Sequence, residues 1–233
     1  MRRRPRRQRC VSVDGTMQGH GADIHLVSGK GGVGKTATAC AIALGARRAG
    51  KKVLLCELDG KDQTSALLGV PKVGYALQEV FEDLFVVDIN PRDALHEYVL
   101  LILKFEALYR AVFENRLVRA FVDLVPSLSE LVMLGKIWFH AVQTEHDRRR
   151  FDVIVVDAPA TGHLLALLEA PQAVYQTVPP GPMRDNAVLL RDMLRNPAQT
   201  QLHVVTTPED SPVTEACTLL RGTQQAQVRL GPV

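Results

Sequence analysis

The chain has 233 residues, of which 46% are hydrophobic and 23% charged, so it can bury one large core and does not have the composition of a disordered protein. No apolar run reaches the about 18 residues that a transmembrane helix needs. Six of the 28 lysines and arginines lie within the first nine positions, so the net charge of +3 belongs to the N-terminus and the remainder is slightly acidic. This distribution excludes a basic, nucleic-acid-binding body.

The basic N-terminal segment, residues 1–21, is predicted to be a disordered extension. An alternative is that Met17 is the true start of translation. A basic segment can also bind nucleic acid or an anionic membrane. It does not fit a secretory or twin-arginine signal, because no apolar stretch follows the arginines. Residues 22–233 are expected to form one domain.

None of the four cysteines belongs to a C-x-x-C pair, so they do not indicate a metal site or a redox motif. Without a secretory signal, reduced thiols in a cytoplasmic protein are expected. Cys40 and Cys56 lie in apolar runs and are predicted to pack in the core.

Residues 24–27 form an apolar, β-prone run, residues 29–36 fit the phosphate-loop pattern G-x-x-x-x-G-K-[ST], and residues 36–48 have a helical pattern. This strand–loop–helix context is what the motif requires, and it makes a glycine-rich turn without a ligand the weaker interpretation. The loop N–H groups and the helix N-terminus are predicted to face an anion. Lys35 is predicted to reach the β- and γ-phosphates, and the Thr36 hydroxyl to hold Mg²⁺. The residues expected to bind the nucleotide are Gly29, Lys30, Gly31, Gly32, Val33, Gly34, Lys35, Thr36 and Ala37.

A second lysine, Lys30, turns the loop into Lys-Gly-Gly-Val-Gly-Lys-Thr. This resembles the deviant phosphate loop of the superfamily that includes arsenical-pump ATPases, tail-anchored-protein targeting ATPases, partition and division ATPases and nitrogenase iron protein. The resemblance implies a face-to-face dimer over two ATP molecules, in which Lys30 crosses to the partner's nucleotide and acts in catalysis together with Lys35. The alternative is that Lys30 is a solvated loop charge.

Residues 52–58 are predicted to be a second strand, parallel to the first and ending at Asp59. In the resembling ATPases, a switch loop here opens with an aspartate that orients the attacking water, so Asp59 is expected to be catalytic. The sequence departs from the usual Asp-Pro-Ala-His, since Gly60, Lys61 and Asp62 follow. A plain strand-end turn is the alternative.

Residues 85–89 are predicted to be a strand and residues 91–146 to be helical, with Ser127 and Glu130 forming a capping box. Residues 113–116 and 134–138 resemble the helical subdomain of short bacterial relatives of the arsenical-pump ATPase. We therefore expect an inserted helical subdomain over about residues 91–150, ending in a solvated run of arginines.

Residues 151–156 deliver Asp157 to a strand end, the Walker B arrangement in which the acid holds Mg²⁺. Residues 157–163 resemble the second switch of the same ATPases, Asp-Thr-Ala-Pro-Thr-Gly-His, with the same spacing of Asp, Thr, Gly and His. His163 either couples this switch to the helices or is an ordinary polar residue.

A helix over residues 181–194 and a strand over residues 203–207 complete the pattern. The predicted fold is α/β, a P-loop NTPase with a mostly parallel, doubly wound sheet and the inserted helical subdomain. In the resembling family, Gly-Pro-Val at positions 231–233 would open another core strand whose following residues contact adenine. We therefore expect the sequence to be truncated, with weak triphosphate binding and little choice between adenine and guanine.

The function predicted from these motifs is a dimeric switch ATPase that hydrolyses Mg-ATP and acts on a membrane-associated partner or client. Its partner subunit would be a second copy or a paired homologous ATPase. The alternatives are a low-turnover nucleotide-binding regulator and a partition- or division-type positioning ATPase. Arsenite binding is not supported, because it needs clustered thiol ligands and the cysteines are scattered.

Overall fold

The computed structural model describes residues 23–58, 60, 62–103 and 127–231. The predicted basic segment, Asp59 and residues 104–126 therefore lie outside the described residues. Within the described part, no helix combines the length and apolar character needed to cross a membrane.

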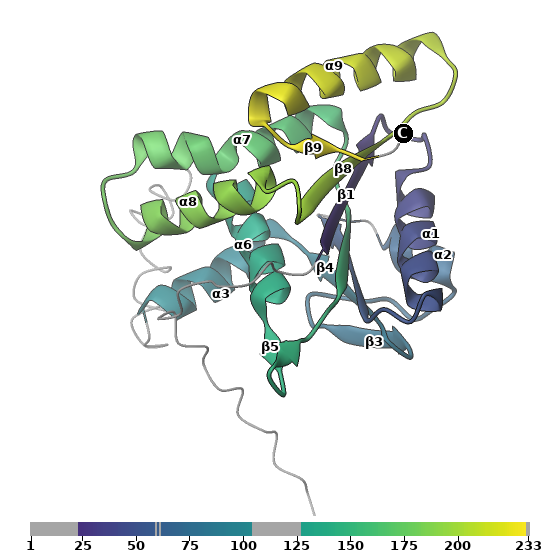
Figure 1. Cartoon of the computed structure of the whole chain (residues 1–233), viewed down its shortest axis with the longest axis horizontal. Helices are drawn as coiled ribbons and strands as arrows, with labels where there is room; N and C mark the ends of the chain where they lie inside the picture. Colours follow the sequence, from purple (N-terminus) through teal and green to yellow (C-terminus); the bar gives the residue numbers. More distant parts are fainter. Residues whose placement is uncertain (1–22, 59, 61, 104–126, 232–233) are drawn as a thin grey trace, which may run out of the picture.

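The core of the molecule is a seven-stranded sheet with the strand order β3-β4-β2-β7-β1-β8-β9 (Figure 1). All neighbouring strands are parallel except β3, which runs antiparallel to β4. The central strands read as almost continuous Val, Ile and Leu because both of their faces are covered, as in other parallel sheets. The strands are β1 (Asp23–Gly29), β2 (Val53–Leu58), β3 (Gln78–Phe81), β4 (Leu84–Ile89), β7 (Val153–Asp157), β8 (Thr200–Val205) and β9 (Arg229–Leu230).

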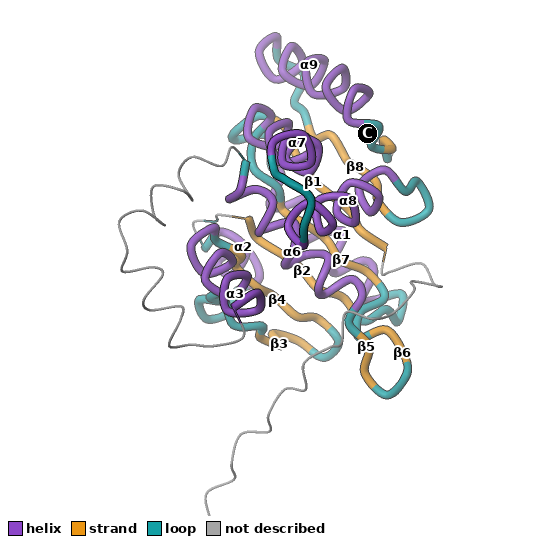
Figure 2. The backbone as a smooth tube through the Cα atoms, turned by 90° about the vertical axis from the view of Figure 1, so that its left-hand side faces the viewer, coloured by secondary structure: helices purple, strands orange, loops and turns teal. Residues whose placement is uncertain are grey.

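Helices cover the two faces of this sheet unequally (Figures 1 and 2). One face packs against α1 (Lys35–Arg48), where Ala39, Cys40 and Ala43 are buried, with α2 (Gln63–Leu68) beside α1. The opposite face carries the larger apolar cluster, to which five helices contribute. These are α3 (Pro91–Leu103), α6 (Leu128–Val142), α7 (Thr161–Thr177), α8 (Pro182–Arg195) and α9 (Asp210–Ala226). The predicted α/β architecture with a mostly parallel, doubly wound sheet is confirmed.

The region after β4 is less helical than predicted. The helical pattern ends at Val142, and β5 (Thr144–Glu145) pairs with β6 (Arg148–Arg149) in a short antiparallel hairpin. The capping box was also wrong, because Ser127 precedes α6 with φ 62° and its side chain makes no capping hydrogen bond. With residues 104–126 outside the described part, the limits of the inserted subdomain stay a prediction.

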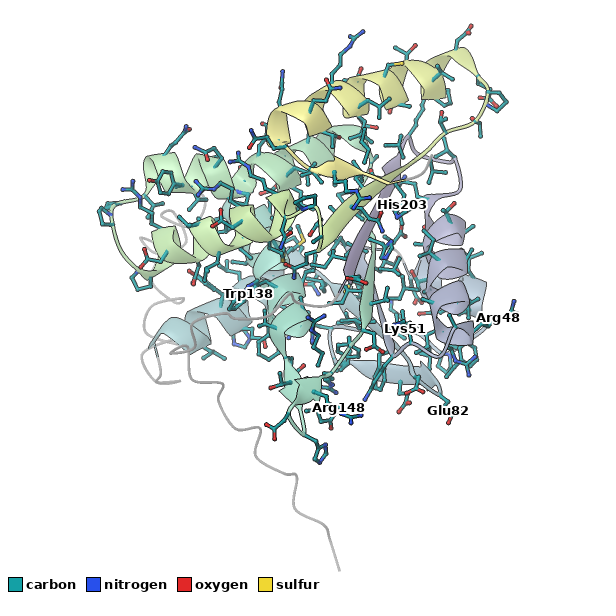
Figure 3. All side chains as sticks on the ribbon, in the orientation of Figure 1. Arg48, Lys51, Glu82, Trp138, Arg148 and His203 are labelled. Carbon is teal, nitrogen blue, oxygen red and sulfur yellow. The ribbon has the colours of Figure 1, made fainter. Side chains whose placement is uncertain are left out.

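The amino ends of the strands carry exposed charges of both signs, including Arg48, Glu82 and Arg148 (Figure 3). At the carboxyl ends, strand register places Val27 and Glu57 directly beside Asp157 on β7. Because β1 continues into the phosphate loop, the loop, Glu57 and Asp157 meet at one end of the sheet. In open parallel sheets, ligands bind at the carboxyl ends of the strands, so a ligand is expected at this end.

Candidate nucleotide-binding site

The glycine-rich loop between β1 and α1 adopts conformations that need its glycines. Gly32 has φ 86° and Gly34 has φ 95°, both in the left-handed region that favours glycine. Gly29 packs so closely on β8 that an added Cβ would lie 2.0 Å from the Val205 carbonyl oxygen. Gly34 caps α1 without a side chain, and the first turn of α1 contains no acidic residue. The N–H groups there are left for an external anion.

The two lysines of the loop point to different places. The Lys35 Nζ donates to the Lys30 carbonyl oxygen at 3.1 Å, which folds the side chain back over the loop. The Lys30 Nζ instead donates to the Ser211 hydroxyl on α9. It also lies 3.6 Å from the Glu215 carboxylate, and the two charged side chains are 33% and 39% exposed. In the single chain, Lys30 is therefore engaged by its own α9.

Thr36 and Asp157 form the centre of the site. The Thr36 hydroxyl donates to Asp157 Oδ2 at 2.6 Å. Asp157 is 8% exposed, and its Oδ1 is buried without a hydrogen-bond partner among the described residues. Burial raises the pKa of Asp157, and the negative charge of Glu57 adds to this, while the Thr36 hydrogen bond and Lys35 oppose it. A buried, unpaired carboxylate oxygen next to a hydroxyl suits a hard cation, so both residues fit a magnesium ion.

Glu57 lies beside this pair and was not predicted as a site residue. It is 5% exposed, and its two carboxylate oxygens accept the backbone N–H groups of Gln63 (3.1 Å) and Thr64 (3.3 Å) at the start of α2. The side-chain Oε1 of Gln63 lies 3.4 Å from the Thr36 hydroxyl oxygen. The sequence contains one clue, because Glu57 is the only charged residue within β2.

The segment after β7 is tied to the strand that carries the phosphate loop. The Ser28 hydroxyl donates to the Pro159 carbonyl oxygen at 2.6 Å, and the Ala158 N–H donates to the Val27 carbonyl oxygen at 3.0 Å. α7 then begins at Thr161, and His163 is exposed in its first turn. Two hydrogen bonds therefore join the segment after Asp157 to β1.

Comparison with known proteins agrees with this geometry. A protein-family model described as anion-transporting ATPase matches residues 22–179. The chain belongs to the anion-transporting ATPase family. The resemblance inferred from the phosphate loop and the second switch is thereby confirmed.

Individual relatives of this ATPase family cover different shares of the chain. ATPase BagA of Mycobacterium tuberculosis (strain ATCC 25618 / H37Rv) is 31% identical over 219 residues, 91% of this chain and 64% of that protein. The arsenical pump-driving ATPase of Escherichia coli is 28% identical over 205 residues, 87% of this chain and 32% of that protein. ATPase get3 of Schizosaccharomyces japonicus is 30% identical over 158 residues, 66% of this chain and 45% of that protein. The chain thus spans less than two thirds of the length of these relatives.

The fold of this family member brings most of the predicted site residues together. Residues 29–37 form the loop and the start of α1, and Asp157 reaches Thr36 from β7. Lys30 is turned toward α9, and Asp59 lies outside the described residues. Cys40 and Cys56 are buried in the core as predicted. The described residues contain no cluster of three or more His, Cys, Asp or Glu side chains that could hold a metal, so a cation at Thr36 and Asp157 needs further ligands from the nucleotide or from water.

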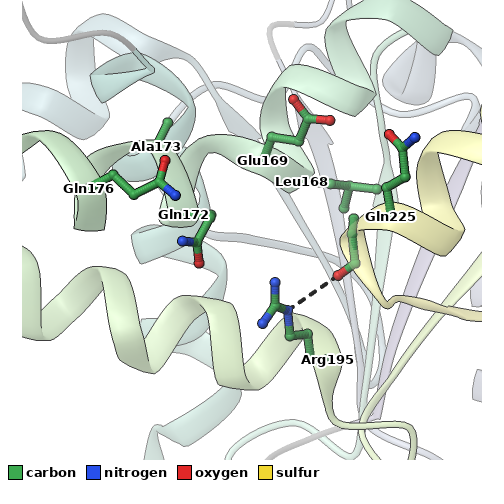
Figure 4. Close-up of a pocket in the computed structure, with 8 residues that line it drawn as sticks. Leu168, Glu169, Gln172, Ala173, Gln176, Arg195 and Gln225 are labelled. Atoms are coloured by element: carbon green, nitrogen blue, oxygen red, sulfur yellow. Dashed lines mark hydrogen bonds between the residues drawn. The ribbon is translucent and has the colours of Figure 1, made fainter.

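A separate groove lies between α7, α8 and the end of α9 (Figure 4). Arg195 crosses it and its Nε donates to the Ala226 carbonyl oxygen at 3.4 Å. The remaining lining side chains include Glu169, Gln172 and Gln225, and none comes from the phosphate loop. Arg195 therefore serves to cap the end of α9.

Proposed function

We propose that this chain is the nucleotide-hydrolysing unit of a switch ATPase that uses Mg-ATP. The observation that carries the proposal is the buried Asp157 Oδ1, which has no hydrogen-bond partner among the described residues. It lies beside the Thr36 hydroxyl, where the glycine-rich loop leads into a helix whose N-terminus has no side-chain cap. Family membership supports it, since the relatives are described as ATPases.

Each residue of the site has a role in this proposal. The loop N–H groups bind the phosphates, and Lys35 leaves the Lys30 carbonyl to neutralise the β- and γ-phosphate charge. Thr36 and Asp157 hold the magnesium ion, which supplies charge neutralisation on the phosphate oxygens when bound. Asp59 is proposed to be one of the groups that orient the attacking water. The protein would act in the cytoplasm, on a client or membrane partner.

The test is the release of inorganic phosphate from ATP, with and without Mg²⁺. Asp157→Asn should lose Mg²⁺-dependent turnover by about 100-fold or more while ATP binding changes less, because the loop and Lys35 are intact. Asp192→Asn, which removes an exposed carboxylate on α8, is the matched control. Hydrolysis that needs no Mg²⁺ in the wild-type protein, or an unaffected Asp157→Asn, would contradict the assignment.

We further propose that hydrolysis requires a second ATPase unit, to which Lys30 is donated. Lys30→Ala should then bind ATP but not hydrolyse it, and it should be rescued by mixing with a protomer that lacks Lys35 but keeps Lys30. Size-exclusion chromatography with and without Mg-ATP measures the assembly directly. Wild-type turnover by Lys30→Ala would instead favour the second candidate.

That second candidate is a low-turnover nucleotide sensor. It is favoured by the contact of Lys30 with Ser211 and Glu215 of its own chain, because a lysine held in this way does not reach a partner's nucleotide. A paired protein should raise steady-state turnover if the chain is a switch ATPase and should leave turnover low if it is a sensor.

A further inference from the structure

Glu57 holds the start of α2 from a neighbouring strand. Glu57 is 5% exposed, and each of its carboxylate oxygens accepts one backbone N–H, from Gln63 or from Thr64. α2 has no cap of its own, since Asp62 precedes it with φ 61° and makes no side-chain capping bond. A charge-assisted bond to backbone N–H is among the stronger hydrogen bonds in proteins. Glu57 is therefore the principal described contact that fixes where α2 begins.

Gly60 gives independent evidence that the chain is built around this carboxylate. A Cβ added to Gly60 would lie 2.1 Å from both Cγ and Oε1 of Glu57. This distance is far below van der Waals contact, so only glycine allows the backbone to pass over the carboxylate. An alanine at position 60 would therefore require the Glu57 side chain or the backbone at this position to move.

This arrangement places Gln63 at the cation end of the site. Glu57 lies directly beside Asp157 in the β2–β7 register, and Gln63 Oε1 lies 3.4 Å from the hydroxyl oxygen that donates to Asp157. Gln63 is itself exposed, and its side-chain amide is in contact with Thr36, the last residue of the phosphate-loop motif. A side-chain amide can accept a hydrogen bond from water while donating one to a phosphate oxygen.

We propose that Glu57 is a positioning residue for ATP hydrolysis, which holds Gln63 where its amide orients the attacking water. The proposal rests on the proposed function above. In the reaction, the water oxygen bonds to the γ-phosphorus as the bond from that phosphorus to the β–γ bridging oxygen breaks. ADP leaves with the electron pair, and a water proton passes to the released phosphate or to solvent. Glu57 touches neither the nucleotide nor the water and acts only through α2.

The first experiment compares kcat and KM for ATP in Glu57→Gln, Gly60→Ala and Gln63→Ala. Each should lower kcat about tenfold or more and leave KM within about threefold, because the phosphate loop is unchanged. Glu57→Asp keeps the charge and should retain more activity than Glu57→Gln.

Two matched controls come from the chain itself. Glu79→Gln removes a carboxylate that also accepts a backbone N–H, from Asp83 at 3.2 Å, but in the distant β3–β4 hairpin. Gly74→Ala adds a Cβ where no atom lies within 4 Å. Both should keep wild-type kcat. A wild-type kcat in Glu57→Gln, or a rise in KM that accounts for the whole loss of kcat/KM, overturns the proposal.

A second readout needs no turnover. In the nucleotide-free protein, amide hydrogen exchange at Gln63 and Thr64 should rise about tenfold in Glu57→Gln, relative to exchange in β1 and β7. If exchange increases in Glu57→Gln but the wild-type protein does not hydrolyse ATP, the proposed function is refuted while the structural role of Glu57 at the start of α2 stands. Unchanged exchange refutes the role of Glu57 whatever the activity. If Glu57→Gln does not fold, the kcat of Gln63→Ala tests the proposal, since this variant leaves the buried Glu57 carboxylate in place. A wild-type kcat in Gln63→Ala would refute the proposal.

Discussion

Two carboxylates of this molecule, Asp157 and Glu97, differ in how completely their hydrogen bonds are satisfied. At the site, Thr36 satisfies one oxygen of Asp157, and the other oxygen has no partner among the described residues. Between α6 and α3, the Lys136 Nζ donates to Glu97 Oε1 at 2.9 Å and Oε2 at 2.7 Å, and the Tyr75 hydroxyl donates to Oε2. The first network is open to a ligand and the second is complete.

The electrostatics of the two carboxylates follow this difference. Burial raises the pKa of Asp157, and the single hydrogen bond from Thr36 does not reverse that effect. Burial also acts to raise the pKa of Glu97, but the hydrogen bonds from Lys136 and Tyr75 outweigh it and the pKa falls. The Lys136 Nζ in addition lies 4.9 Å from the centre of the Tyr75 ring. The hydrogen bonds of the Glu97 network stabilise its negative charge, whereas Asp157 lacks such stabilisation until a cation binds.

The largest expected effect is that of Lys35→Ala, which should weaken nucleotide binding but not folding stability. Lys35→Ala should weaken nucleotide binding about 100-fold or more, or about 2.8 kcal/mol, because it removes the main cation facing the phosphates. Thermal unfolding of the free protein should change little, since Lys35 makes only one described hydrogen bond. Fluorescent-nucleotide titration measures the affinity. Lys51→Ala, an exposed lysine after α1, is the control and should bind as the wild type does.

In the network of Lys136, Glu97 and Tyr75, a substitution should instead lower folding stability and leave nucleotide binding unchanged. Lys136→Met keeps the aliphatic stem but leaves Glu97 without its cation, and it should reduce the free energy of unfolding by about 2 kcal/mol. This figure is discounted from the fully buried case because the Glu97 side chain is 37% exposed. Urea denaturation measures the change, and nucleotide affinity should be unaffected. Lys52→Met breaks a surface pair with Glu145 at 3.6 Å and should cost less than about 1 kcal/mol. Equal losses in the two variants would contradict the comparison.

Acid pH should reduce the folding stability of the protein through His140, a histidine on the same helix as Lys136. His140 on α6 is 4% exposed, and burial, reinforced by Lys136 and Arg150, lowers its pKa to about 4 against the partial opposition of Gln143 and Glu97. Because the unfolded chain binds the proton near pH 6.5 and the folded chain does not, the contribution of His140 is complete above pH 6.5 and is lost between pH 6.5 and 4.

The expected loss from His140 between pH 7.5 and pH 5 is on the order of 1–2 kcal/mol. His140→Gln should flatten this decline, while His163→Gln, which removes an exposed histidine, should retain it. Denaturant unfolding at several pH values makes the measurement. A wild-type decline that persists unchanged in His140→Gln would assign the pH dependence to other groups.

The site was predictable where its chemistry is contiguous in the sequence. Residues 29–36 specify their own conformation through glycines and a following helix, and Asp157 ends an apolar strand. Glu57 was missed because its role depends on where the chain returns after β2, which propensity does not encode. The contact of Lys30 with Ser211 and Glu215 joins residues at opposite ends of the sequence, so only the fold could reveal it.

The fold was predictable for the long, apolar elements and less so for the short ones. Two residues of β9 form a strand only because β8 offers a free edge. The β5–β6 hairpin turns at His146 and Asp147, which adopt φ 51° and 60° without a glycine to indicate a turn. The capping box failed because its residue spacing is common, whereas Ser127 adopts a left-handed conformation in which its side chain makes no capping hydrogen bond.

The smallest expected effect tests how far the Glu97 network is cooperative. Tyr75→Phe removes the hydroxyl that donates to Glu97 but keeps the ring beside Lys136, so the loss should be about 1 kcal/mol. If the network polarises as a unit, the loss should shrink when Lys136→Met is already present, because the charge that strengthens the bond to the hydroxyl is no longer held in place. A double-mutant cycle by urea denaturation measures this coupling. Strict additivity of the two changes would mean that Tyr75 and Lys136 bind Glu97 independently, and the second network would then be complete without being cooperative.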